Sequence, residues 1–177
     1  MGVTSSRGQE ANAPIMGAPV LEVRDLVKDF RDRGGTMVRA LDGVSLRVMA
    51  GELVALVGPS GAGKSTLLSI VAGLEPPTAG EIALGGDPLA PRLGHVGYMP
   101  QRDLLLPWRT ALDNAIAGLQ VRHMPRDEAR VRARALFATF GLGGFERSYP
   151  YALSGGMRQR VAFARSVLAS GDLLLLD

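Results

Sequence analysis

The stretch Gly58-Pro-Ser-Gly-Ala-Gly-Lys-Ser-Thr66 limits most strongly what this chain can fold into. It matches the pattern G-x-x-x-x-G-K-[ST], in which a glycine-rich turn joins a strand to the start of a helix. Residues 53–57 before it form an unbroken apolar run, which is typical of a strand buried on both faces of a parallel sheet. Residues 66–73 after it have helical apolar spacing and end at a glycine. We therefore predict a strand, a phosphate-binding turn and a helix in succession.

This turn has the chemistry of a nucleotide site. Main-chain N–H groups converge at a helix N-terminus, where the helix dipole adds about half a positive charge. In the pattern, Lys64 reaches the β- and γ-phosphates and Ser65 binds Mg²⁺. The predicted nucleotide-binding residues of the turn are Gly58, Pro59, Ser60, Gly61, Ala62, Gly63, Lys64, Ser65 and Thr66.

Composition narrows the class of protein. With 177 residues, 46% of them hydrophobic, the chain can bury one sizeable core. The absence of cysteine excludes disulfides and thiolate metal sites. No apolar run approaches the ~18 residues that a membrane span needs, so we expect a cytoplasmic protein. Residues 1–18, rich in Gly, Ala, Ser and Pro, are predicted to form a disordered tail before a domain at 19–177.

Periodicity predicts an α/β chain. Strands are expected at 20–26, 44–48, 53–57, 81–84, 95–99 and 173–177, and helices at 66–73, 110–119, 126–140 and 154–169. Thr110 and Ser154 are predicted helix N-caps. The basic residues at 122–134 have no interleaved aromatic residues, so we interpret them as a solvated helix face and expect no nucleic-acid partner.

Five motifs, in order, resemble the nucleotide-binding subunit of ATP-binding cassette (ABC) transporters. They are Phe30, the loop at 58–66, Gln101, Leu-Ser-Gly-Gly-Met at 153–157, and four leucines before Asp177. Each alone has a plainer explanation, such as a core aromatic residue or an N-cap, but their order and spacing favour the family. The resemblance implies a P-loop NTPase fold: a RecA-like core, an N-terminal antiparallel β-subdomain, and a helical subdomain at 102–153.

The resemblance also implies the site. Phe30 would stack on the adenine of ATP, and Asp177 would hold Mg²⁺ together with Ser65 and Gln101. Lys64, Gln101 and Asp177 would be the catalytic residues. The signature residues Ser154, Gly155 and Gly156 would hold the γ-phosphate bound by a second nucleotide-binding subunit in a head-to-tail dimer.

Residues 102–114 resemble the corresponding segment in the ATP-binding subunits of importers for nitrate, sulfonate and taurine. Met157, in place of the commoner glutamine, also suits that subgroup. The resemblance then implies permease subunits as partners and a peripheral position on the inner face of the membrane. Trp108 is compatible with core packing or with permease docking. In the family a water-positioning glutamate follows Asp177, so we expect that a C-terminal part is missing and that this stretch hydrolyses ATP poorly. The alternative is an inactive nucleotide-binding fragment with a regulatory or interaction role.

Overall fold

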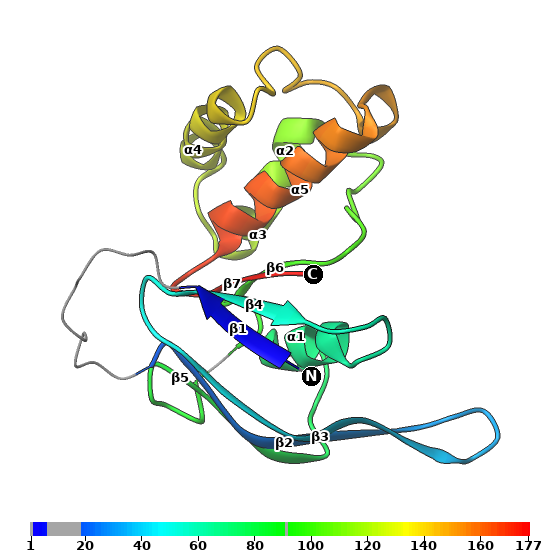
Figure 1. The fold of residues 1–177 in the computed structure, drawn as a ribbon. Helices are drawn as coiled ribbons and strands as arrows, with labels where there is room; N and C mark the ends of the chain where they lie inside the picture. The colour runs from blue at the N-terminus through cyan, green and yellow to red at the C-terminus, as the bar shows by residue number, and fades with distance from the viewer. Residues whose placement is uncertain (1, 7–18, 91) are drawn as a thin grey trace. The chain divides into compact units, whose positions relative to one another are not determined.

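The computed structural model describes residues 2–6, 19–90 and 92–177, with the main chain alone for 2–6. The chain divides into two compact units, Met1–Leu93 and Gly94–Asp177 (Figure 1). None of the helices in the described ranges is both long and apolar enough to span a membrane.

An antiparallel sheet dominates the first unit. Its strands are β2 (Leu21–Arg31), β3 (Met37–Val48) and β5 (Ala79–Leu84), in the order β3-β2-β5. β2 and β3 form one hairpin that is longer than the predicted strands, running from the Leu21–Val48 pair to the Arg31–Met37 pair. Register shifts after Val23 break the alternation of side chains, which explains why the apolar pattern alone understates both strands.

β4 (Leu53–Val57) lies where the apolar run predicts a strand, but it is not buried on both faces. Leu53 is 73% exposed and Val57 is 59% exposed. Among the described residues, β4 pairs only with β1 (Gly2–Ser6), which runs antiparallel to it. This strand corrects the prediction of a disordered tail for residues 2–6, because an open strand edge pairs readily with an extended segment. Residues 1 and 7–18, which share that prediction, lie outside the described residues.

α1 (Lys64–Val71) follows the glycine-rich loop. Its C-terminus confirms the role predicted for Gly73, which has a φ of 79° and donates its N–H to Ile70. The N–H of Leu74 reaches back to Ser69, which completes a Schellman motif. Leu67, Ile70 and Val71 are buried, so α1 is anchored along its inner face.

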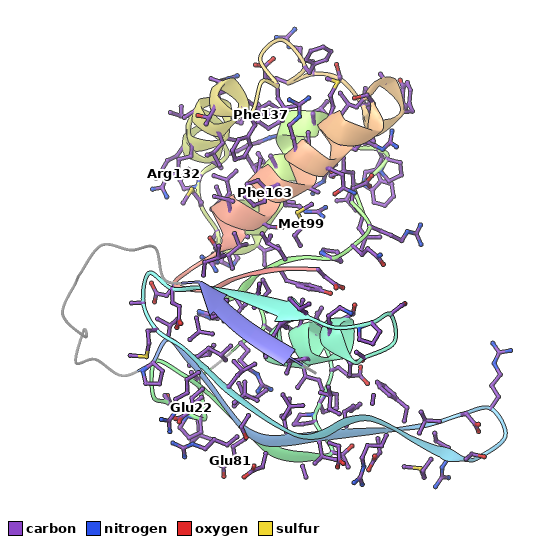
Figure 2. The ribbon with its side chains drawn as sticks, in the orientation of Figure 1. Glu22, Glu81, Met99, Arg132, Phe137 and Phe163 are labelled. Atoms are coloured by element: carbon purple, nitrogen blue, oxygen red, sulfur yellow. The ribbon has the colours of Figure 1, made fainter. Side chains whose placement is uncertain are left out.

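Helices are the main regular elements of the second unit. They are α2 (Ala111–Ala115), α3 (Ala117–Val121), α4 (Arg126–Thr139), a short 3₁₀ turn (Pro150–Ala152) and α5 (Gly155–Ala169). α5 packs against α2, α3 and α4, and Phe137 lies fully buried in the shared core (Figure 2). β6 (Gly97–Met99) and β7 (Leu174–Leu176) pair in parallel.

One predicted helix, at 110–119, is in fact two. Thr110 caps α2 as predicted, its hydroxyl accepting the N–H of Asp113, but the helix ends at Ala115 and α3 begins at Ala117. A Cβ on Gly118 would lie 2.6 Å from the Cβ of Ala169, so α3 approaches α5 very closely. Because Gly118 and Ala169 are far apart in the sequence, the local pattern of apolar residues does not predict this contact.

Candidate functional site

The glycine-rich loop ends at an N-terminus of α1 that no side chain caps. The N-cap residue is Gly63, and the first turn of α1 contains no acidic residue. Gly61 and Gly63 have φ values of 80° and 85°, which a residue with a side chain rarely adopts. The loop therefore presents main-chain N–H groups and the positive end of a helix dipole, which together favour an anion.

Lys64 folds back over this loop. Its Nζ donates to the carbonyl oxygens of Gly58 at 2.8 Å and Pro59 at 2.7 Å. A lysine ammonium has three donors, and these two bonds hold it at the centre of the turn. The positive charge is thus already in place beside the helix N-terminus.

Gly63 is pressed against β3. A Cβ at this position would lie 2.5 Å from the carbonyl oxygen of Ala40 and 2.8 Å from a methyl group of Leu41. The backbone of the loop can reach this depth only because Gly63 has no side chain. The close contact with β3 therefore fixes the position of the loop.

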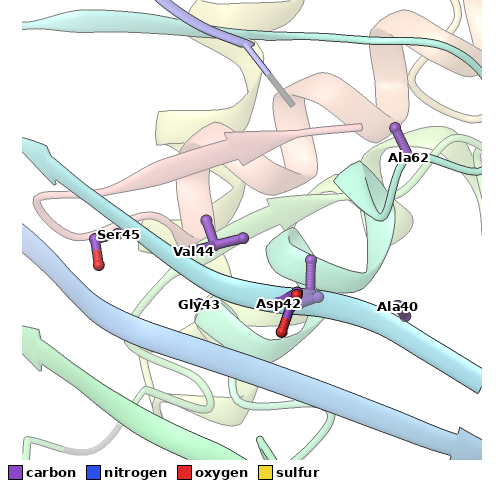
Figure 3. Close-up of a pocket in the computed structure, with 7 residues that line it drawn as sticks. Ala40, Asp42, Gly43, Val44, Ser45 and Ala62 are labelled. Atoms are coloured by element: carbon purple, nitrogen blue, oxygen red, sulfur yellow. The ribbon is translucent and has the colours of Figure 1, made fainter.

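Phe30 lies on the same hairpin as Ala40. It pairs with Val38, which is two residues from Ala40, or about 7 Å along the strand. Phe30 is 40% exposed, so it is not the core aromatic residue that composition alone would allow. A cavity of about 380 Å³ is lined by residues of β3 and by Ala62 of the loop (Figure 3). Its volume is within the range of small-molecule sites.

The second unit brings Gln101 and Asp177 to one edge of its parallel pair. Met99 of β6 lies opposite Leu176 of β7, so both strands end at the same edge. Asp177 follows β7 directly and Gln101 follows β6 by two residues. The Tyr98 hydroxyl donates to the Asp177 carboxylate at 3.5 Å, and the N–H of Asp177 donates to Met99.

Ser154 is the N-cap of α5, as predicted, and its hydroxyl accepts the N–H of Met157. Ser154, Gly155 and Gly156 are exposed. A Cβ on Gly156 would meet nothing within 4 Å, and its φ is not positive. Nothing in the described chain therefore requires a glycine at this position.

Two arginines of α5, to which sequence reasoning gave no role in the site, tie the segment after Gln101 to that helix. Arg165 donates to the carbonyl oxygens of Asp103 and Leu104, at 2.7 and 2.8 Å, and Arg158 donates to the Asp103 carboxylate at 3.1 Å. Leu104 has a φ of 44°, so the segment is strained as well as tethered. Burial lowers the pKa of Arg165, which still remains charged at neutral pH. Partners about 60 positions apart leave no local pattern in the sequence.

Two large aromatic side chains of the second unit are exposed. Trp108 is 72% exposed and Tyr151 is 83% exposed, and Tyr151 stacks on Tyr149 with 5.8 Å between ring centroids. Core packing, one of the two interpretations of Trp108, is therefore wrong.

This chain is similar to known proteins in both its sequence and its fold. The model of the ABC transporter family matches residues 41–177. The chain is 46% identical over 137 residues to the formylaminopyrimidine import ATP-binding protein ThiZ of Halalkalibacterium halodurans, covering 77% of this chain and 53% of that protein. It is 44% identical over 138 residues to the taurine import ATP-binding protein TauB of Yersinia pestis, covering 78% and 54%. It thus spans about half the length of these relatives.

The solved structure of a dimeric bacterial ABC transporter cassette, MJ0796, has a TM-score of 0.74 and 31% identity, covering 89% of this chain and 73% of that one. The same cassette bound to ADP and Pi has a TM-score of 0.73. The predicted P-loop NTPase fold is thus confirmed, as is the resemblance on which it rested. This chain belongs to the ABC transporter family, and its fold is that of the ATP-binding cassette.

Proposed function

We propose that this chain is the ATP-binding part of an ABC importer subunit. It binds Mg-ATP at the glycine-rich loop, pairs head-to-tail with a second nucleotide-binding subunit, and drives permease subunits from the inner face of the membrane. The observation that carries the proposal is the uncapped N-terminus of α1, with Lys64 at the centre of the loop.

The loop fits a triphosphate. Residues 58–66 offer main-chain donors, and the lysine ammonium can exchange its two carbonyl partners for phosphate oxygens. Phe30, partly exposed on β2, is the aromatic surface for adenine, and the cavity beside Ala62 offers space for the nucleoside.

Ser65 and Asp177 would hold Mg²⁺, which supplies positive charge that offsets the charge developing on the phosphates in phosphoryl transfer. Gln101 would sense the occupied site and pass its state to the tethered segment at 103–104. Asp103 and Arg165 connect this segment to α5, so a shift at Gln101 reaches the helix that begins with Ser154. Lys64, Gln101 and Asp177 are the proposed catalytic residues.

The dimer proposal rests on the signature residues. The N–H groups of the exposed residues Gly155 and Gly156 at the start of α5 suit an anion, and Gly156 leaves space that no described residue of this chain fills. That space would admit the γ-phosphate held by a second subunit. The dimeric cassette to which this chain is similar favours this arrangement.

The helical subdomain at 102–153 is the proposed permease-docking region. Its exposed Trp108, Leu104 and Tyr151 provide apolar and aromatic area of the kind that dominates protein interfaces. ThiZ and TauB are named as import proteins for a formylaminopyrimidine and for taurine. We propose a small solute of this kind as the cargo, although the ATP-binding subunit does not itself select it.

Calorimetric titration with Mg-ATP tests the proposal. Lys64→Ala removes the charge at the loop and should weaken ATP binding by about tenfold or more, as expected for a charge-assisted contact. Arg134→Ala, on the exposed face of α4, makes the same change in charge and should leave the affinity unaltered. Equal affinity of the Lys64→Ala variant and the unmodified chain would overturn the assignment of the loop.

A further inference from the structure

Lys28 is a buried lysine that the proposed function does not use. It lies on β2 and is only 7% exposed. A lysine is almost never buried to this extent unless its ammonium is paired. Lys28 and Phe30 are two positions apart on β2, and the Lys28 ammonium lies over the Phe30 ring, so the two side chains lie on the same face of the sheet.

Within the described part of the chain, the Lys28 ammonium has three partners, and one of them is Phe30. Its Nζ donates to the carbonyl oxygen of Pro76 at 2.7 Å, forms an ion pair with Glu75 at 3.0 Å, and lies 4.8 Å from the centroid of the Phe30 ring. A cation at this distance over a ring face is attracted by the quadrupole of the ring. One face of Phe30 is thus held by Lys28, while the side chain remains 40% exposed.

The partners of Lys28 belong to the segment that leaves α1. Residues 75–78 follow the C-terminus of α1 and are joined to β2 by two more bonds. The N–H of Thr78 donates to Val27 at 2.8 Å, and the Thr78 hydroxyl accepts the N–H of Asp29 at 2.9 Å. The phosphate loop leads into α1, and this segment follows the turn that closes the C-terminus of α1. Lys28 therefore links the ring to the element that positions the loop.

Stability alone is a weak explanation for a buried ammonium. Replacing buried ion pairs with apolar residues of similar size is often neutral or stabilising. A methionine at position 28 would fill similar space, and it would not attract the ring as a cation does.

We propose that Lys28 is a positioning residue for the base of the nucleotide. Its ammonium holds Phe30 by one ring face, so that the ring presents its other face to adenine at a fixed place relative to the phosphate loop. This proposal rests on the proposed role of Phe30. It predicts that Lys28 contributes to the affinity for adenine nucleotides and contributes nothing to the affinity for the phosphate chain alone.

Calorimetry on the intact chain with two probes, Mg-ATP and Mg-tripolyphosphate, tests this inference. Lys28→Met should weaken ATP binding about three- to tenfold, the range expected for a partly desolvated cation–π contact, and leave tripolyphosphate binding unaltered. Lys28→Arg, which keeps a cation over the ring, should restore most of the ATP affinity. Circular dichroism identifies any variant that fails to fold.

A double-variant cycle with Phe30→Ala separates the possible outcomes. If Lys28 acts through the ring, Lys28→Met should have no further effect on ATP affinity in the Phe30→Ala background. Equal loss for ATP and tripolyphosphate, no loss for ATP, or a full additional loss in the Phe30→Ala background would each overturn the inference. Unaltered ATP affinity in the Phe30→Ala single variant would instead overturn the proposed role of Phe30, and the inference with it.

Discussion

Gly63 has no room for a side chain, and this fixes the depth of the phosphate loop against β3. A Cβ would collide with the main chain at Ala40, which cannot rotate away as a side chain can. The φ of 85° adds strain for any other residue. The same position combines a packing constraint with a conformational one.

Gly63→Ala should therefore lower the free energy of unfolding by more than about 2 kcal/mol, as strain and overpacking add. ATP affinity should also fall, because the displaced loop no longer surrounds the phosphates. Urea unfolding and calorimetry measure the two effects.

Gly85→Ala is the matched control for this prediction. Gly85 also has a positive φ, of 57°, but its Cβ would meet nothing within 4 Å. It should show the strain alone, with normal ATP binding. Equal effects of the two substitutions would show that the contact with β3 has no role.

At the scale of elements, Asp113 joins α2 to α4. Its carboxylate accepts a bond from Arg126 and one from Arg130, each at 3.0 Å. Partial burial acts to raise the pKa of Asp113, but the two guanidinium bonds outweigh it and hold the pKa below its usual value of 3.8. A carboxyl with a lowered pKa stabilises the folded state above the unfolded pKa, and this contribution is lost as the pH falls through the folded pKa.

Asp113→Asn should thus lower the free energy of unfolding by about 1–3 kcal/mol at pH 7, and this difference from the unmodified chain should shrink below about pH 4. Urea unfolding monitored at pH 7, 5, 4 and 3 measures it. Asp127→Asn, an exposed substitution in the first turn of α4 with the same change in charge, should cost only a few tenths of a kcal/mol. A difference for Asp113→Asn that is the same at every pH would contradict the ionic explanation.

The elements that sequence predicts well are those whose signals are local. The helix caps at Thr110 and Ser154, and the end of α1 at Gly73, depend on neighbours within a few residues, and all three are confirmed. In each case the chemistry of one turn decides the outcome.

The elements that sequence predicts poorly depend on distant partners. The break between α2 and α3 accompanies the approach of Gly118 to Ala169, and the exposure of β4 depends on which strands pair with it. In the candidate site, the contacts of Arg158 and Arg165 with Asp103 span about 60 positions. Lys28 lies two residues before Phe30, but a register shift between Lys28 and Asp29 breaks the simple alternation of this hairpin, so spacing alone did not predict the contact of the two side chains.

At the scale of the whole molecule, the proposed activity requires a second copy of the signature residues. The loop at 58–66 and the start of α5 each have N–H groups suited to phosphate, yet in the proposed dimer they serve different nucleotides. A substitution that is harmless to one chain should then disable the pair. At Gly156 the needs of the single chain and those of the dimer can be tested separately, because nothing in the described chain contacts the Cβ site of this residue.

Gly156→Ala should leave the folded monomer equally stable or slightly more stable, since alanine has the higher helix propensity. ATP affinity of the monomer should also be unaltered, whereas ATP-dependent dimers should be lost because the added methyl group occupies the space proposed for the γ-phosphate of the second subunit. Light scattering of the intact subunit with Mg-ATP measures the dimer, and Gly143→Ala, also unobstructed, is the control. A dimer that persists in the Gly156→Ala variant would show that the start of α5 does not contact the nucleotide of the second subunit.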